Sequence, residues 1–255
     1  MELLELERVS KFYGGLAANA SISCKIREGE IVSLIGPNGA GKTTLFNVIT
    51  GVERPDGGAV VFDGRHIGGQ ESSEIARLGL VRTFQQTKIF RDVLVRDAVV
   101  MGRHLHDRVS LLQALVWGPA ARAARRAALD DVARILGFVG MSVHAGVTAR
   151  NLAYGDQKLL GIAIALAARP RLLLLDEPAA GMNAAESARL MEIIRKIRGN
   201  GITVALVEHN MRLVMSVSDR VLVLNYGELI AEGTPEQVRR DPEVLRAYLG
   251  SDAHA

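Results

Sequence analysis

The stretch that decides the fold is Gly36-Pro37-Asn38-Gly39-Ala40-Gly41-Lys42-Thr43, which fits the phosphate-binding pattern G-x-x-x-x-G-K-[ST]. A short apolar and β-branched run, Ile31–Ile35, precedes it and predicts a buried strand. The apolar residues of Thr43–Thr50 predict the first turns of a helix after it. The order of strand, glycine loop and helix is the setting in which this pattern binds a phosphate.

The residue types in this loop suit a nucleotide phosphate. Gly36, Gly39 and Gly41 lack a Cβ, so the backbone can curl closely around an anion and turn several N–H groups toward it. The partial positive charge at the start of the following helix attracts the same anion. Lys42 adds a point charge for the outer phosphates, and the Thr43 hydroxyl is a ligand for Mg²⁺. The loop predicts nucleotide binding but does not by itself specify the reaction.

The composition indicates one large domain or two small ones, in a chain of 255 residues of which 48% are hydrophobic. The single cysteine, Cys24, excludes an intrachain disulfide and suits a reducing cytosol. The first residues lack the form of a signal peptide, and no apolar run approaches the roughly 18 residues of a membrane span. The net charge is +3. The arginine-rich segment Arg122–Arg126 predicts a solvated helix face rather than a nucleic-acid site, because no aromatic residues interleave there.

The hydrophobic pattern predicts an α/β chain. Alternating residues over Glu2–Val9 and Ala20–Ile26 predict a small antiparallel sheet near the N-terminus. Apolar runs without a polar break predict central strands that are covered on both faces. The further predicted strands are Ala59–Phe62, Leu80–Phe84, Leu172–Asp176, Ile202–Val207 and a hairpin of Val221–Leu224 and Glu228–Glu232, and the further predicted helices are Ser72–Leu78 (N-cap Ser72 or Ser73), Lys158–Ala168, Ala184–Ile197, Pro235–Arg239 and Pro242–Leu249.

The segment between Val93 and Met141 differs in character, because alanine, leucine and arginine dominate it and glycine is sparse. Two apolar stripes at helical spacing predict two helices with a break at Trp117-Gly118-Pro119. We expect the stripes to form core, and an exposed remainder would be a docking surface for a partner. The stripes consist of Leu111, Leu112, Leu115 and Val116, and of Ala127, Val132, Ile135, Leu136 and Phe138.

Polar residues follow three of the predicted strands at the point where each strand ends. The glycine loop follows the first, Asp176 and Glu177 follow a run of four leucines, and His209 comes shortly after Val207. The carboxyl ends of parallel strands are where α/β sheets bind ligands. A buried strand does not end in two carboxylates without a reason, because an unpaired buried charge costs several kcal/mol.

Two further residues each allow two interpretations. Tyr13 lies near the first predicted turn, where it either stacks on an adenine or packs against the sheet. Gln85 follows a predicted strand and is either a surface glutamine or a loop residue with a function. The residues alone do not decide between the two interpretations of Tyr13, whereas for Gln85 they favour a surface glutamine.

Taken together, these elements resemble the nucleotide-binding subunit of an ABC transporter over essentially the whole chain. Six motifs in the family's order make a chance match implausible. They are the Walker A loop at Gly36–Thr43, the Q-loop at Gln85, the signature at Leu152–Gln157, the Walker B strand at Leu172–Asp176 followed by Glu177, the D-loop at Ala179–Asn183 and the H-loop at His209. The resemblance implies a P-loop NTPase fold in one cassette, 1–255, with a mostly parallel core sheet. In it, 1–92 and 170–255 form a RecA-like core with an antiparallel β subdomain, and 93–169 form an inserted helical subdomain.

Within that family, the chain is similar to the ATPases of branched-chain amino acid (LIV-type) importers. The long helical insertion between Gln85 and Asn151 suits that branch. The lipopolysaccharide-export ATPase has a similar tail, but its signature keeps Ser-Gly-Gly where this chain has Ala153-Tyr154-Gly155. The segments that match the LIV branch are Arg82–Gln85, Asn151–Gly155, Glu177–Asn183, Val207–Met211, Gly233–Gln237 and Ala247–Gly250.

Two positions depart from the family's signature. Ala153 removes the serine hydroxyl that contacts the γ-phosphate in most members, and Asp156 stands where Gln or Glu is usual. A carboxylate is favourable in the first turn of a helix, but close to a triphosphate it is not, unless it points away or pairs with Lys158. We therefore expect the backbone of Tyr154 and Gly155, rather than Asp156, to provide the signature contact.

The resemblance implies an ATPase that works as a head-to-tail pair, either a homodimer or two paralogues, with two ATP molecules between the subunits. It implies that Glu177 is the general base, that His209 contacts the γ-phosphate, and that Lys42 holds the β- and γ-phosphates. It assigns Mg²⁺ to Thr43, Gln85 and Asp176. The implied ATP-binding residues are Tyr13 on the adenine, Gly36, Pro37, Asn38, Gly39, Ala40, Gly41, Lys42, Thr43, Thr44 and Asp176, and, from the opposite subunit, Tyr154 and Gly155.

The same resemblance implies two integral membrane permease subunits, a periplasmic solute-binding protein that acts through them, and no nucleic acid. It places the chain on the cytoplasmic face of the inner membrane. Leucine-type amino acids lead as the solute, followed by urea, amides or aromatic acids. Three rival hypotheses remain: a soluble ABC ATPase of translation or DNA repair, a P-loop kinase, and a hydrolysis-dead cassette, for which Asp156 is the argument.

Overall fold

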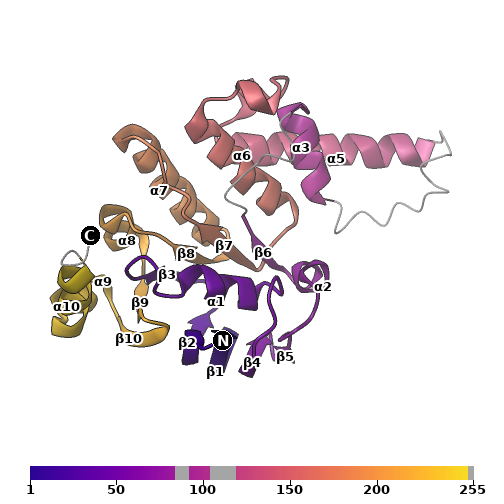
Figure 1. Cartoon of the computed structure of the whole chain (residues 1–255). Coiled ribbons are helices and arrows are strands. Elements are labelled where there is room, and N and C mark those ends of the chain that lie inside the picture. Colours follow the sequence, from indigo (N-terminus) through magenta and orange to yellow (C-terminus); the bar gives the residue numbers. More distant parts are fainter. Residues whose placement is uncertain (84–91, 104–118, 252–255) are drawn as a thin grey trace.

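The computed structural model describes residues 1–83, 92–103 and 119–251, which form two β-sheets with helices packed around them (Figure 1). The predicted Q-loop residue Gln85 and the predicted stripe Leu111–Val116 lie outside the described residues. The same is true of Phe84, the predicted end of a strand, and of Trp117 and Gly118 in the predicted break.

The first sheet is antiparallel and has the strand order β2-β1-β4-β5, with β1 at Glu2–Tyr13, β2 at Leu16–Arg27, β4 at Gly57–Phe62 and β5 at Arg65–His66. The predicted N-terminal sheet is therefore confirmed, but β1 and β2 are longer than predicted. The register of β1 against β2 shifts between Leu6 and Val9 and again before Lys11, and Arg8 has φ 49°. Such bulges break the alternation of apolar and polar residues, so the sequence pattern ended before the strand did.

The second sheet has the order β10-β9-β3-β8-β7-β6 and is parallel except for the edge pair of β10 with β9, which is antiparallel. Leu34 of β3 and Asp176 of β7 both pair with Val207 of β8, which lies between them. The carboxyl ends of these three strands therefore meet at one edge of the sheet. The strands are β3 (Ile31–Ile35), β6 (Leu80–Arg82), β7 (Leu172–Asp176), β8 (Thr203–Val207), β9 (Arg220–Asn225) and β10 (Glu228–Gly233).

Both faces of the second sheet are covered, as the apolar runs predict. Leu173 and Leu175 of β7 belong to a core cluster shared with α6 (Tyr154–Ala167) and α7 (Ala184–Gly199). Leu172 and Leu174 belong to a second cluster, shared with α1 (Lys42–Ile49) and the first sheet. Each leucine of β7 is thereby buried, and α1 is held between the two sheets. This packing fixes the glycine loop at the start of α1.

A group of helices, which we call the helical subdomain, comprises α3 (Val95–Gly102), α5 (Pro119–Phe138), the short 3-10 turns η3 (Ser142–His144) and η4 (Ala149–Asn151), and α6. It lies on the side of the second sheet away from the first sheet, and α5 extends from it as a long arm (Figure 1). Val132 and Leu136 are buried, Ile135 and Phe138 are half-buried, and Ala127 is exposed, so the second predicted stripe is confirmed except for Ala127. The end of that stripe, and not the outer part of the arm, is what packs into the core.

The remaining helices are α2 (Ser72–Arg77), α8 (Met211–Val217), α9 (Pro235–Arg240) and α10 (Pro242–Ser251). The predicted N-cap of α2 is wrong: Glu71 occupies that position, and no side chain caps the helix. Helix α6 begins at Tyr154, four residues before its predicted start at Lys158. Helix α8 was not predicted from the sequence, because its seven residues are too few to show a helical period.

Cys24 of β2 is buried, and burial raises the pKa of its thiol to about 12.

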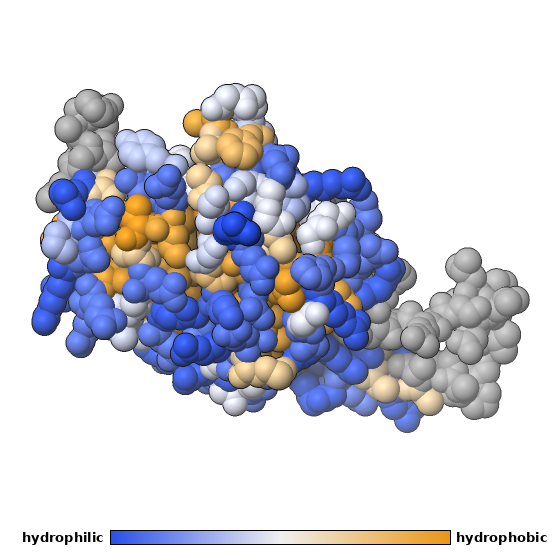
Figure 2. Space-filling model, turned by 90° about the horizontal axis from the view of Figure 1, so that it is seen from below, coloured by the Kyte–Doolittle hydropathy of each residue, from blue (hydrophilic) through white to orange (hydrophobic). Residues whose placement is uncertain are grey.

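The face of the molecule seen in Figure 2 is mostly hydrophilic, and apolar residues appear on it in separate areas between charged side chains. Among the described residues, none of the helices combines the length and the apolar character that a membrane span needs.

Candidate active site

A hollow of about 360 Å³ opens beside the glycine loop, and we call it the loop hollow. It is lined by Tyr13, Leu16, Ala17, Ala18, Asn38, Gly39, Ala40, Gly41, Lys42, Thr43, Thr44, Glu177 and Tyr226. The loop thus shares one hollow with a carboxylate that follows β7, with Tyr13 at the end of β1 and with Tyr226 in the turn between β9 and β10. This arrangement brings together several residues that the sequence analysis selected from distant segments.

The glycine loop is closely packed, and two of its glycines cannot be replaced without strain. A Cβ on Gly36 would lie 2.1 Å from the carbonyl oxygen of Leu224, and one on Gly41 would lie 2.2 Å from that of Ala18. Gly41 also has φ 98°, which other residues rarely adopt. Its carbonyl accepts a hydrogen bond from Nδ2 of the fully buried Asn19 at 3.1 Å. Asn19 is a support that the sequence analysis missed.

Lys42 is folded into the loop. Its Nζ donates to the carbonyl oxygens of Gly36 at 2.7 Å and of Pro37 at 2.8 Å. Burial lowers the pKa of Lys42, and the nearby negative charge of Glu177 acts in the opposite direction. The loop carbonyls therefore hold the ammonium group in place at the inner end of the loop hollow, where an anion would meet it.

The aromatic side of the loop hollow contains Tyr13, at the end of β1, and Tyr226, in the turn between β9 and β10. Tyr13 is 47% exposed, and its hydroxyl donates to Glu53, a hydrogen bond that raises the pKa of the tyrosine. Tyr13 is therefore not a core residue, and it lies in the lining of the loop hollow. The turn that contains Tyr226 packs against the glycine loop, where the N–H of Gly227 donates to the carbonyl oxygen of Ala40 at 3.1 Å. Tyr226 was not predicted from the sequence, because only this contact brings it to the loop.

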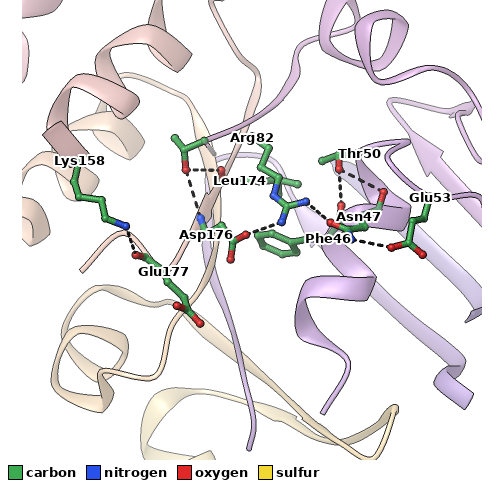
Figure 3. A network of polar contacts seen from close by, with 10 residues as sticks. Phe46, Asn47, Thr50, Glu53, Arg82, Lys158, Leu174, Asp176 and Glu177 are labelled. Carbon is green, nitrogen blue, oxygen red and sulfur yellow. Dashed lines mark hydrogen bonds and ion pairs between the residues drawn. The ribbon is translucent and has the colours of Figure 1, made fainter. Parts of the chain in front are cut away.

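Asp176 forms a buried ion pair with Arg82 at the end of β6 (Figure 3). Arg82 Nη2 lies 2.6 Å from Asp176 Oδ2, and the two side chains are 9% and 5% exposed. Arg82 also donates from Nη1 to Oδ1 of Asn47 on α1 at 2.7 Å and lies over the ring of Phe46. Asn47 in turn donates to Glu53 at 2.9 Å. Arg82 thereby joins α1, β6 and β7, a role that the sequence analysis did not predict.

Glu177 lies in the loop hollow in an unusual backbone conformation. Its φ of 44° is rare for a residue with a side chain and persists only where surrounding contacts impose it. Here its N–H donates to the carbonyl of Val207 at 2.9 Å, and its carbonyl accepts from Lys158 Nζ of α6 at 3.3 Å (Figure 3). The main chain of Glu177 is therefore held both by the neighbouring strand β8 and by helix α6.

His209 comes two residues after the end of β8, at the same sheet edge, but its exposed side chain is not part of the lining of the loop hollow. The backbone N–H groups of His209 and Asn210 donate to the buried carboxylate of Glu208, and Asn210 caps α8. The structure thus brings His209 to the predicted edge without placing it against the glycine loop.

The signature residues Tyr154 and Gly155 also lie outside the loop hollow of their own chain. They pack against the chain's own D-loop and α7: a Cβ on Gly181 would lie 2.7 Å from the Tyr154 ring, and one on Gly155 would lie 2.6 Å from Glu186. Asp156 pairs with Arg189 of α7 at 3.1 Å. The expectation that Asp156 is engaged elsewhere is confirmed, but its partner is Arg189 rather than Lys158.

The residues present fit a hard divalent cation such as Mg²⁺. Asp176 Oδ1 is buried and has no hydrogen-bond partner among the described residues, and Thr43 lines the loop hollow with an exposed side chain. The described residues contain no group of three His, Cys, Asp or Glu side chains that would hold a metal alone. Mg²⁺ is commonly held by one or two carboxylates together with substrate phosphates, which matches this donor set.

Comparison with known proteins now decides the family. Residues 20–180 match the family model described as ABC transporter, and residues 228–254 match the model described as branched-chain amino acid ATP-binding cassette transporter. The chain belongs to the ABC transporter family. It is an ATPase of that family, and its fold, a P-loop NTPase with a mostly parallel core sheet, is the one that the sequence motifs predict.

Curated ABC relatives match almost end to end. The high-affinity branched-chain amino acid transport ATP-binding proteins LivG of Salmonella typhimurium and of Escherichia coli are 46% and 44% identical to this chain over 249 residues, with 97% of this chain and 98% of each relative covered. BraF of Pseudomonas aeruginosa, of the same description, is 43% identical over the same length.

Solved ABC cassettes agree in fold. A nucleotide-free ATP-binding cassette from an ABC transporter superimposes with a TM-score of 0.86 at 30% identity, covering 97% of this chain and 99% of that one. The ADP conformation of such a cassette gives 0.86 at 31% identity, covering 98% and 99%. The family membership therefore rests on sequence and on structure over nearly the whole length of the chain.

Proposed function

We propose that this chain is the ATP-hydrolysing subunit that powers an importer of branched-chain amino acids or related small polar solutes. The single observation that supports hydrolysis best is that Lys42 and Glu177 line the same hollow beside the glycine loop. The solute is proposed from the names of the LivG and BraF relatives and from the match of residues 228–254.

Nucleotide binding is assigned to the loop hollow. The backbone N–H groups of Gly36–Thr44, apart from Pro37, which has none, and the start of α1 surround the phosphates. Lys42 Nζ leaves the carbonyls of Gly36 and Pro37 for the β- and γ-phosphate oxygens. Tyr13 stacks on the adenine, and Tyr226 closes the same end of the hollow. A bound triphosphate supplies negative charge close to this buried ammonium group.

Mg²⁺ is assigned to Thr43, Asp176 and Gln85, of which Gln85 lies outside the described residues. When bound, the metal neutralises charge on the phosphates as they are transferred. Asp176 serves this site through Oδ1, because Oδ2 is already held by Arg82. The protein's own contribution is to keep that carboxylate oriented at the end of β7.

Hydrolysis is assigned to Glu177 as general base, which accepts a proton from the attacking water, with His209 positioned on the γ-phosphate. The backbone of Glu177 is held by contacts with Val207 and Lys158, so its side chain leaves the main chain from a fixed position in the lining of the hollow. Lys42 and the loop amides stabilise the charge that develops on the phosphate oxygens.

Two subunits are needed for a complete site. Tyr154 and Gly155 lie outside the loop hollow of their own chain, which supports a head-to-tail pair in which each signature closes the hollow of the other subunit. Within each subunit, 1–92 with 170–255 are proposed to form the core, and 93–169 the helical subdomain. The other proposed partners are two membrane permeases on the cytoplasmic face of the inner membrane, served by a periplasmic solute-binding protein.

The test of the base is Glu177→Gln, with the exposed Glu236→Gln as matched control. We expect ATP turnover to fall about 100-fold or more while nucleotide affinity stays within about threefold, because only the proton acceptor is lost. Phosphate release and equilibrium binding of a fluorescent ATP analogue measure the two quantities. Wild-type turnover in Glu177→Gln would show that another group is the base.

A further inference from the structure

Glu208 is a fully buried acidic residue that joins the two loops following β7 and β8. It is 1% exposed. Its Oε1 accepts a hydrogen bond from the N–H of Ala179 at 2.7 Å, and its Oε2 accepts from the N–H groups of His209 at 3.1 Å and of Asn210 at 3.2 Å. A carboxylate is costly to bury unless N–H donors replace its water, and here three backbone donors do so.

The two loops that Glu208 joins are those that contain Glu177 and His209. Ala179 is two residues after Glu177, and the turn between them is closed by the N–H of Ala180 on the carbonyl of Glu177 at 3.2 Å. On the other side, Asn210 caps α8 through its side chain, so the loop is fixed at both ends. The left-handed backbone of Glu177 needs such external contacts to persist.

We propose that Glu208 is a positioning residue for ATP hydrolysis, because its two oxygens fix the loop of Glu177 and the loop of His209 relative to each other. This inference rests on the roles proposed above for those two residues. Glu208 itself is not among the residues that line the loop hollow, so it acts through the loops rather than on the nucleotide.

Glutamine is the informative substitution, because it keeps the size and shape of the side chain but has only one oxygen. Its amide group must turn that oxygen either toward Ala179 or toward the His209 and Asn210 pair. Its NH₂ group then faces the backbone N–H donors of the other loop, and those donors lose the acceptor that the carboxylate provides. Glu208→Gln therefore breaks the connection between the loops while filling the same space.

The experiment compares Glu208→Gln with Glu192→Gln, an exposed glutamate on α7. We expect the kcat for ATP to fall about 10- to 100-fold in Glu208→Gln, while the dissociation constant for trinitrophenyl-ATP stays within about threefold, because the catalytic groups but not the glycine loop are displaced. Wild-type kcat in Glu208→Gln, or an equal loss of affinity and kcat, would overturn the proposal.

A second measurement tests the contacts without any catalysis. Hydrogen exchange of the nucleotide-free protein is expected to be faster in Glu208→Gln for the peptides that contain Ala179 or His209–Asn210, and unchanged in Glu192→Gln. Should Glu208→Gln not fold, Glu208→Asp, whose shorter chain cannot reach both loops, is held to the same kcat and affinity criteria. If Glu177→Gln is inactive but Glu208→Gln is not, the positioning role fails while the proposed function stands.

Discussion

At the scale of single residues, the buried pair of Arg82 and Asp176 leads to a stability prediction for the nucleotide-free protein. Arg82→Met leaves Asp176 as a lone buried carboxylate, so we expect the free energy of unfolding to fall by about 3–5 kcal/mol. Adding Asp176→Asn removes that charge and should restore most of the loss. Urea unfolding in EDTA without nucleotide measures both, and an equal cost of Arg82→Met in the Asp176→Asn background would contradict the prediction.

The candidate site shows which residues a sequence can reveal. The glycine loop, Glu177 and Tyr13 were predicted because each lies in or beside a contiguous motif or strand end. Arg82 and Tyr226 were not, because their roles exist only through contacts with segments far away in the chain. The orientation of Asp156 could be expected from its charge, but its partner Arg189 could not, because 33 residues separate the two.

At the scale of elements, Asp131 on α5 holds the helical subdomain together. Hydrogen bonding from Arg169, at the end of α6, and the charges of Arg103 and Arg134 lower the pKa of Asp131 below its usual value of 3.8. Arg103, after α3, is the well-buried partner, 2.5 Å away, whereas the side chains of Arg134 and Arg169 are more than half exposed and screened by solvent. One carboxylate thus ties three helices together.

Because the folded-state pKa of Asp131 is depressed, its stabilisation is present above the unfolded pKa and is lost as the pH falls through the folded pKa. We therefore expect Asp131→Asn to lose about 2 kcal/mol at neutral pH and progressively less below about pH 4. The neighbouring exposed Asp130→Asn is the control. Urea unfolding across that pH range measures the difference, and a loss that does not shrink in acid would rule out the charge as its cause.

The elements themselves were largely predictable. Continuous apolar runs identified β3, β7 and β8, because a strand that is covered on both faces does not alternate between apolar and polar residues. The bounds of β1 and β2 were not predictable, because bulges reset the side on which residues lie. Helix α8 and the two-residue strand β5 are too short for any period to appear, and their positions depend on packing.

At the scale of the whole molecule, the proposed head-to-tail pair predicts complementation between two inactive variants. Lys42→Ala removes the loop cation, and Gly155→Ala disturbs the signature, so each homodimer has two defective sites. A mixed dimer contains one site with an intact Lys42 and an intact Gly155. Equal mixing is therefore expected to recover up to about a quarter of wild-type ATPase activity if two copies of this chain form the pair.

The controls for this experiment are each variant alone at the same total concentration, with circular dichroism to establish that both fold. Activity that rises only on mixing indicates sites shared between subunits. If the mixture stays as inactive as its components although light scattering detects mixed dimers, the composite site is refuted. If no dimers of this chain form at all, the pair is not a dimer of this chain alone.

The seclusion of Cys24 gives the protein a practical use in optical work. Because the thiol of Cys24 is buried and its pKa is raised to about 12, almost none of it is thiolate at neutral pH. We therefore expect it not to react with maleimide dyes. An engineered cysteine at Val143, which is 85% exposed on the helical subdomain, would then be the only site to take up a fluorophore. Donor and acceptor dyes on two such subunits would report the closing of the pair in real time, without a substitution that removes the native cysteine.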